Sequence, residues 1–515
     1  MNRTFDRPLA LVIVDGWGFS TTTRGNAIAA AHTPNYDAIR SRYPWTTLAA
    51  SGSEVGLESG QAGNAEIGHM NIGGGRVVKT VFSRIQESIR TGDFFSNEAI
   101  GVALRSANER GAAVHLIGMI SDSEVHASMD SMYALLRMAK NARAEQVYIH
   151  GILDGRDTRP RSADVFVEAA EIKMAEIGIG KFATLCGRFY AMDSSENWER
   201  TARAFTMLTF GEGERASDAV AAIRNSFLRG ISEEFIAPIV LESEPGKPVA
   251  KIASGDLVIF FNHRADTMRQ LVRSLAVPDQ GIVAPASKPW IETVCLAEYD
   301  RAFKMPVAFP TWHEGNSLSE IFAAYSVNNL RITETDRVPH LSRLFNCGSE
   351  TGGANEQTIE IAAGNTVIRE SEPEMQSFKI TDRLLRGMEA GVANVFIVNI
   401  PSPGLIAETG NFDRTVEAVQ YVDTCLGGIV EKVNEMNGIA LITASHGNCE
   451  EMVDQNGQPH RKSTANPVPM HLVGPGFEDS DLRHDGSLCD IAPTVLELMG
   501  IARPAEMSGR GLFAE

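Results

Sequence analysis

Short apolar runs that end abruptly in polar clusters recur along the chain. The clearest of them read LALVIVDG, AAVHLIGMISD, QVYIHGILDGRD, FATLCGRFYAMD, DLVIFFNHRAD, NVFIVNIPSPG and IALITASHGN. Continuous apolar runs of this length are typical of strands that are buried on both faces of a parallel sheet. Helix-like stretches lie between them, among them Ser131–Asn141 and Ser162–Ile177. The alternation predicts an α/β fold.

The polar tails of these runs are the first places to seek a binding site. In open α/β sheets, ligands bind beyond the carboxyl ends of the strands. Several tails carry arginine, and an aspartate accompanies one of them: Arg156, Asp157, Arg159, Arg161, Arg188, Arg264 and Arg337. Guanidinium groups grip carboxylate and phosphate groups in a bidentate manner. The arginines therefore either converge on a small anion or pair with acids on the surface.

Three further strand ends carry side chains that suit acid–base or metal chemistry. His126, in SEVHAS, is a candidate general acid or base, with a purely structural histidine as the alternative. Asp15 ends LVIVDG and His446 lies in TASHGN. Both are common metal-ligand types, although two ligands do not make a site.

Composition narrows the class of protein. The chain has 515 residues and a formal net charge of −18, which disfavours nucleic acid and anionic membranes as partners. Its six cysteines are far apart and include no C-x-x-C pair, so we expect neither a disulfide framework nor a structural zinc site. The apolar run near the start, Leu9 to Val14, is too short for a signal peptide or a membrane span. A cytoplasmic protein is expected.

Two stretches suggest hinges between domains. A proline-rich segment spans Lys288 to Trp312, and GGGR occupies Gly73 to Arg76. The glycine run lacks the lysine and serine of a P-loop, so a structural role is favoured over phosphate binding.

The motifs together resemble the cofactor-independent (2,3-bisphosphoglycerate-independent) phosphoglycerate mutases of the alkaline phosphatase superfamily. The resemblance runs nearly end to end, in the family's order, through VIVDGWG, SGSEVGLESGQAGNAEIGHMNIGGGR, ILDGRDTRPRSA, GRFYAMD, NHRAD, LRITETD, ITASHGN and DIAPTVLELMG. It implies an alkaline-phosphatase-like α/β domain, residues 1–76 and 311–515, with a second α/β domain, residues 77–310, inserted in it. The inserted domain would bind the substrate.

The resemblance implies that much of the substrate site is retained. His126, Arg156, Asp157, Arg188 and Arg264 match family positions that hold the glycerate, and His126 and Asp157 would be the catalytic pair. The family's lysine becomes Arg337, which keeps the charge. Two family arginines are replaced, by Ser194 and by Thr267, so the pocket is less basic.

The phosphoryl-transfer side is more altered. In the family a serine carries the phosphoryl group and two manganese or magnesium ions flank it. The serine position is Ala65, which is inert. Other metal-ligand positions hold Gly404, Glu408, Ser445 and Ser463, while Asp15 and His446 are unchanged. We therefore expect no cofactor, with Asp15, Glu408 and His446 as the ligands of at most one residual Mg²⁺ or Mn²⁺ ion.

Three functions follow as hypotheses. The favoured one is a mutase-like protein repurposed to act on a small glycerate-like phosphate or phosphonate without a phosphoserine, as a diverged transferase or isomerase. The second is an inert phosphoglycerate-binding pseudoenzyme with a regulatory role. An ordinary phosphoglycerate mutase is the least favoured. We expect a monomer whose partner is a small anionic substrate.

Overall fold

The computed structural model describes residues 7–277, 288–310, 315–349, 353, 355–362, 371–454 and 457–514. The chain divides into two compact units. Unit 1 is Met1–Thr80 with Trp312–Glu515, and unit 2 is Val81–Thr311. The domain boundaries predicted from the sequence fall after residues 76 and 310. Trp312, the end of the predicted proline-rich hinge, lies outside the described residues.

Unit 1 is built on a mixed sheet that is mainly parallel. Within the described residues it has eight strands, in the order β13 (Glu356–Ile361), β12 (Asn329–Glu334), β14 (Val395–Ile400), β1 (Leu9–Val14), β15 (Ile439–Thr443), β16 (Val468–Val473), β2 (Trp45–Ala49) and β17 (Gly486–Ser487). β1 runs parallel to both of its neighbours, β14 and β15, whereas β16 is antiparallel to β15 and to β2. All six residues of β1 are buried, as its continuous apolar sequence predicts.

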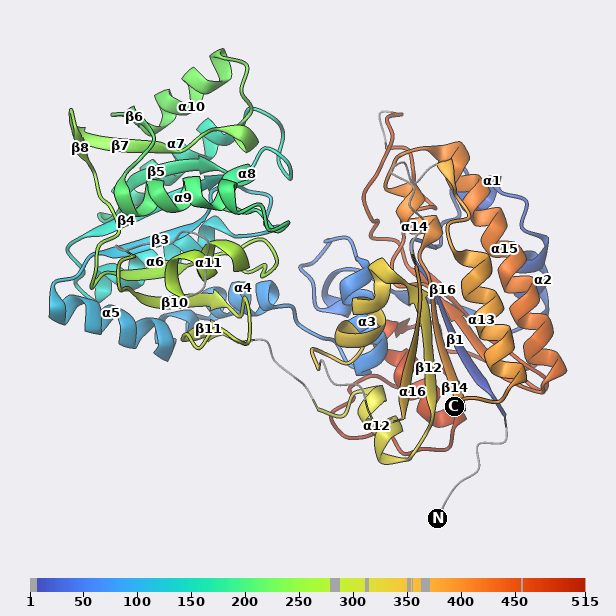
Figure 1. Cartoon of the computed structure of the whole chain (residues 1–515). Helices are drawn as coiled ribbons and strands as arrows, with labels where there is room; N and C mark the ends of the chain where they lie inside the picture. The colour runs from blue at the N-terminus through green and yellow to red at the C-terminus, as the bar shows by residue number, and fades with distance from the viewer. Residues whose placement is uncertain are drawn as a thin grey trace. The chain divides into compact units, whose positions relative to one another are not determined.

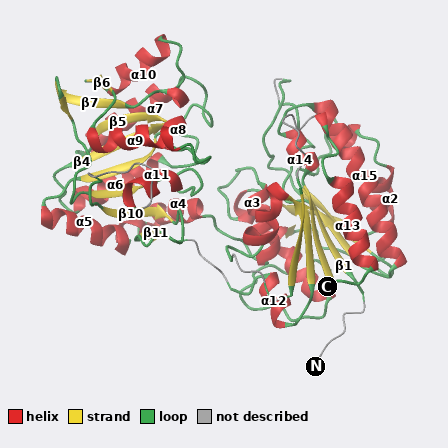
Figure 2. Ribbon diagram, in the orientation of Figure 1, coloured by secondary structure: helices red, strands yellow, loops and turns green. Residues whose placement is uncertain are grey.

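The helices of unit 1 cover this sheet (Figure 2). α13, α15 and α2 lie along one face, and α3 lies toward the other side of the sheet. The helices are α1 (Ala27–Ala30), α2 (Pro34–Arg42), α3 (Ala65–Gly74), α12 (Leu318–Ala324), α13 (Ser377–Glu389), α14 (Ser402–Ala407), α15 (Phe412–Glu435) and α16 (Ile491–Leu498). One hydrophobic core joins the sheet to these helices.

Unit 2 is built on a second mixed sheet (Figure 1). Its strand order is β11 (Val307–Phe309), β10 (Glu292–Ala297), β9 (Leu257–Phe260), β3 (Val114–Met119), β4 (Val147–Leu153), β5 (Lys181–Gly187), β7 (Ile239–Glu244) and β6 (Glu214–Ala216), and β8 (Lys247–Pro248) pairs with β7. The strands from β11 to β5 are parallel. Their carboxyl ends therefore lie at one edge of the sheet.

The helices of unit 2 are α4 (Val81–Thr91), α5 (Glu98–Arg110), α6 (Met129–Asn141), α7 (Ala163–Ile177), α8 (Arg188–Ala191), α9 (Trp198–Phe210), α10 (Ala219–Leu228) and α11 (Arg269–Ala276). Of these, α6, α7 and α11 connect successive parallel strands, whereas the others lie before β3 or between β5 and β7. α6 and α7 closely match the two helices that the sequence predicts. This unit has its own hydrophobic core.

The predicted α/β fold class is confirmed by two mixed sheets and the helices that pack on them. Each apolar run named in the sequence analysis contains a strand. All six cysteines are free and buried. No helix in the described part of the chain is long and apolar enough to cross a membrane.

Candidate active site

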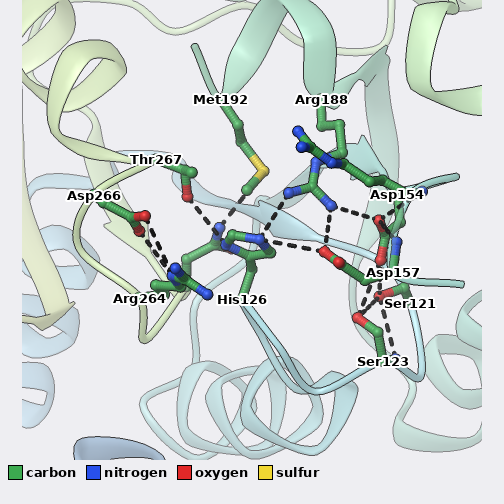
Figure 3. Close-up of polar contacts among 12 residues, drawn as sticks. Ser121, Ser123, His126, Asp154, Asp157, Arg188, Met192, Arg264, Asp266 and Thr267 are labelled. Atoms are coloured by element: carbon green, nitrogen blue, oxygen red, sulfur yellow. Dashed lines mark hydrogen bonds and ion pairs between the residues drawn. The ribbon is translucent and has the colours of Figure 1, made fainter. Parts of the chain in front are cut away.

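Four loops in unit 2 meet because the strands that precede them are neighbours. β9, β3, β4 and β5 are adjacent and parallel, so the residues that follow them lie at one edge of the sheet. Figure 3 shows His126 after β3, Asp154 and Asp157 after β4, Arg188 after β5 and Arg264 after β9. The structure thus brings together residues that are up to 138 positions apart, 264 minus 126, in the sequence.

Asp154 is the centre of this polar cluster, and the sequence analysis missed it. The side chain is 2% exposed. Its Oδ1 accepts hydrogen bonds from Arg188 Nη1 at 2.7 Å and from the backbone N–H groups of Arg156 and Asp157. Its Oδ2 accepts from the hydroxyls of Ser121 and Ser123. One buried carboxylate therefore fixes the β3 loop, the β4 loop and the β5 arginine.

Arg188 joins three of the functional side chains. Its guanidinium donates to Asp154 and Asp157, and its Nη2 lies 2.7 Å from His126 Nε2. Burial opposes the charge of Arg188, but the hydrogen bonds to Asp157 and Asp154 outweigh it and raise the pKa of the guanidinium. The adjacent His126 and Arg188 side chains in turn hold the pKa of Asp157 well below its ordinary value, against the effect of burial. Arg188 and Asp157 are both ionised at neutral pH.

The two other predicted arginines of this edge are more exposed. Arg264 pairs with Asp266, its Nε 3.0 Å from Oδ1, and its side chain is 45% exposed. Arg156 is exposed, and its backbone is fixed by Asp154. Exposed guanidinium groups beside a buried ionic cluster are suited to receive an anionic ligand.

Glu233 holds the loop that follows β4 through hydrogen bonds to its backbone. The carboxylate is fully buried and accepts the backbone N–H groups of Arg161 and Ser162, each at 2.9 Å. Arg161 has a φ of 61°, a conformation that costs energy for a residue with a side chain. The buried carboxylate helps to hold that turn in place.

A second polar cluster lies at the carboxyl edge of the sheet in unit 1. Asp15, directly after β1, is fully buried. Its Oδ1 accepts from the Ser445 hydroxyl at 2.6 Å and from Asn399 Nδ2 at 3.0 Å, and its Oδ2 lies 3.3 Å from Arg337 Nε. Burial raises the pKa of Asp15, but Arg337 and two nearby histidines outweigh it and lower the pKa to about 2. Asp15 is therefore a carboxylate at neutral pH.

The histidines of this cluster are neutral. Burial lowers the pKa of His446 to about 4, and Asp15 opposes the shift only in part. Burial also lowers the pKa of His340 to about 3 and that of His69. His69 and His340 meet edge to face, with ring centroids 5.4 Å apart. Neutral imidazoles beside a carboxylate can accept a proton or bind a ligand.

Ala65 is the first residue of α3. The Asn64 side chain caps the helix by accepting the backbone N–H of Ile67. One turn later Gly68 packs against Ser445 so closely that a Cβ at position 68 would lie 2.2 Å from the Ser445 carbonyl oxygen. Ser445 Oγ also lies 2.8 Å from His446 Nδ1. The first residue of α3, Ala65, thus has only a methyl side chain, whereas Ser445, in the segment against which α3 packs, has a hydroxyl.

The metal ligands that the sequence analysis predicted are not grouped together in the described part of unit 1. Among the described residues, no group of three or more His, Cys, Asp or Glu side chains is placed to hold one, so the predicted set of Asp15, Glu408 and His446 does not form such a group. Glu408 is exposed at the end of α14. A Cβ at Gly404 would lie 3.0 Å from the carbonyl group of Asp15, so an aspartate there requires the Asp15 segment to shift.

Among the residues that the sequence analysis missed, Asp154 has a clear sequence signal. Asp154 is the first polar residue after β4, just as Asp15 is after β1. The same rule would have selected it. His69 and His340 lie on helical turns, which no strand-end rule can identify.

Comparisons with known proteins assign the family. Residues 85–301 match the family model "BPG-independent PGAM N-terminus". The chain is 42% identical over 511 residues to the 2,3-bisphosphoglycerate-independent phosphoglycerate mutase of Moorella thermoacetica, a match that covers 99% of each chain. It is 41% identical to mutase 1 of Methanosarcina acetivorans, again over 99% of each chain.

A solved structure shares the fold. The phosphoglycerate mutase of Leishmania mexicana, determined at low cobalt concentration, superposes with a TM-score of 0.80 at 24% identity and covers 99% of this chain and 98% of that one. A likeness at this level of identity concerns the fold.

Two expectations are corrected by these comparisons. The favoured hypothesis, a repurposed protein, and its inert alternative are contradicted, because full-length relatives at about 40% identity are named phosphoglycerate mutases. The ordinary mutase, which we ranked last, is the function that the relatives favour.

The expectation of no cofactor is contradicted as well, because the related structure was determined with cobalt present. We based that expectation on the metal-ligand positions that this sequence has lost. The loss of ligands in one sequence does not change the metal that its relatives bind.

The family resemblance itself is confirmed. The matches to these relatives cover 99% of the chain, so they include both units. This chain belongs to the 2,3-bisphosphoglycerate-independent phosphoglycerate mutase family of enzymes.

Proposed function

We propose that this chain is a phosphoglycerate mutase, which moves a phosphoryl group between the two hydroxyls of a phosphoglycerate. The relatives with full-length matches carry that name. The observation that carries the proposal is the ionic cluster at the edge of the unit 2 sheet, where Arg188, Asp157 and His126 meet. We further propose that the protein acts as a monomer in the cytoplasm.

Unit 2 would bind the glycerate. Arg156 and Arg264 are exposed cations beside the cluster, and phosphoglycerate carries a carboxylate and a phosphate that such groups bind. Asp157 is ionised and His126 has a ring nitrogen next to it, at 3.3 Å. This pair is suited to bind the free hydroxyl of the glycerate and to exchange its proton. Arg337, in unit 1, would neutralise a phosphate through its guanidinium.

The phosphoryl group needs an acceptor other than Ala65, since a methyl group cannot form an ester. We assign this role to Ser445, whose hydroxyl donates to the Asp15 carboxylate and lies next to His446. A carboxylate and a neutral imidazole are the groups that activate serine nucleophiles. Because Ser445 is fully buried, access of the phosphate requires a local opening of this segment.

The step balances without an external reactant. Ser445 Oγ forms a bond to phosphorus as the bond between phosphorus and the glycerate oxygen breaks. The hydroxyl proton passes to His446, and the same proton passes from His446 to the glycerate oxygen as it leaves. The reverse step on the other hydroxyl returns the phosphoryl group and restores the serine.

Phosphorus NMR of the purified chain with 3-phosphoglycerate tests the function. Mg²⁺, Mn²⁺ and Co²⁺ are supplied in separate reactions. We expect 2-phosphoglycerate to accumulate, and the rate to fall at least roughly tenfold in Arg188→Met prepared in parallel, since hydrogen bonds to charged groups contribute about 1.5–3 kcal/mol. No product under any metal, or equal rates in both preparations, would refute the proposal, the second outcome because it reveals a contaminating mutase.

A further inference from the structure

Thr267 occupies a position where the family resemblance predicts an arginine, and it contacts the ring of His126. Its Oγ1 lies 3.1 Å from His126 Nδ1 (Figure 3). Thr267 follows β9 and His126 follows β3, and these two strands are parallel neighbours. The backbone reinforces the approach, because the N–H of His263 donates to the carbonyl oxygen of His126 at 2.8 Å. The contact is therefore built into adjacent strand ends.

The other ring nitrogen of His126 faces a group that can only donate. Arg188 Nη2 lies 2.7 Å from His126 Nε2. Because a guanidinium has no acceptor, Nε2 must carry a lone pair while this hydrogen bond exists. A neutral imidazole has one proton, so that proton is on Nδ1 and is donated to the hydroxyl of Thr267.

Protonation of the ring leaves the contact with Thr267 unchanged. A proton on Nε2 turns this nitrogen toward the carboxylate of Asp157, which lies 3.3 Å away, and breaks the hydrogen bond with Arg188. Nδ1 keeps its proton in both states. Nε2 is therefore the nitrogen that gains and loses a proton, in a space shared by an anion and a cation.

We infer that Thr267 is a positioning residue that accepts the Nδ1 proton of His126, so that Thr267 and Arg188 together hold the Nδ1-protonated tautomer and leave Nε2 as the nitrogen that exchanges a proton with the substrate hydroxyl. An arginine at position 267 could not accept this hydrogen bond, since it too has only donors. The threonine thus does more than lower the positive charge of the site. The catalytic consequence, but not the tautomer, rests on the proposed mutase function.

Nitrogen-15 NMR of the full chain labelled at histidine tests the tautomer. His126→Gln identifies the signal, and the chemical shifts of the two ring nitrogens show which one is protonated. We expect Nδ1 to be protonated in the wild type and in Thr267→Ser, and a mixture of tautomers in Thr267→Val. Thr206→Val, which removes an exposed hydroxyl on α9 of the same unit, is the matched control and leaves the signal unchanged.

Kinetics of the same variants test the role. In Thr267→Val we expect kcat to fall roughly 3- to 10-fold, the value of one hydrogen bond, with KM little changed and with Thr267→Ser close to the wild type. A wild-type His126 protonated on Nε2 alone, or a Thr267→Val variant with the wild-type tautomer, overturns the inference. Absence of turnover in the wild type refutes the proposed function while the NMR result still decides the tautomer.

Discussion

The carboxylate of Asp154 holds the guanidinium of Arg188, with Oδ1 2.7 Å from Nη1 and both side chains buried. The same oxygen orders the backbone of the loop that carries Arg156 and Asp157. A single buried group therefore couples the stability of unit 2 to the geometry of the candidate substrate site.

Replacement of Asp154 tests this coupling. Asp154→Asn keeps the shape of the side chain but removes its charge from a buried arginine, so we expect the free energy of unfolding to fall by about 2 kcal/mol. Urea unfolding measures the loss. The matched control is Asp164→Asn, whose partner Arg224 is 53% exposed, so solvent screens this pair and we expect a much smaller loss. Equal losses in the two variants would contradict the assignment.

Replacement of Arg264 should weaken substrate binding without lowering stability, whereas replacement of Asp154 should lower stability. Among the described residues the Arg264 side chain pairs with Asp266, two positions away, and it is exposed, so Arg264→Ala should leave the melting temperature almost unchanged. If the residue grips the anionic substrate, KM should rise about tenfold or more, as for the loss of a charge-assisted hydrogen bond. Steady-state kinetics and thermal melting decide this, with Arg224→Ala as the surface control. An unchanged KM would remove Arg264 from the substrate site.

Ser445 is assigned as the carrier of the phosphoryl group. Ser445→Ala should reduce turnover to the background rate, and intact-mass measurement of acid-quenched wild type should show one added phosphoryl group that the variant lacks. Ser402→Ala is the control, because Ser402, like Ser445, is a buried serine of unit 1. Its hydroxyl contacts the hydroxyl of Ser377. Turnover by Ser445→Ala would locate the carrier elsewhere.

His446 makes stability depend on pH. Burial lowers its pKa from 6.5 to about 4 in the folded protein, so between these values the unfolded chain binds more protons and stability falls as the pH falls. The shift corresponds to about 3 kcal/mol. We expect His446→Gln to lose less stability than the wild type between pH 6.5 and pH 4, measured by urea unfolding in chelator. Parallel pH profiles would show that His446 titrates normally.

The sequence predicted the strands and the edge of the sheet at which the candidate site residues lie, because apolar runs and their polar tails are local patterns. It named His126, Arg188 and Asp157 without showing that they touch. That contact depends on strand order, which places β3 between β9 and β4 and which no local pattern encodes.

The partners of individual hydrogen bonds also could not be predicted from the sequence. Thr267 was noticed only as a lost arginine, since its role rests on the distance to one ring nitrogen. Asp154 was passed over for its neighbours Arg156 and Asp157. Burial explains why Asp154 was missed. Asp154 is 1% exposed and orders the site from inside the protein, whereas the exposed residues are the ones that would contact the ligand.

The parallel register of β9, β3, β4 and β5 has a consequence for experiments on ligand binding. The four strand ends that form the cluster are separated along the chain by helices, so the cluster exists only while the whole sheet is paired. A ligand that binds this edge should therefore slow amide hydrogen exchange across the centre of the sheet, and not only in the loops that it touches.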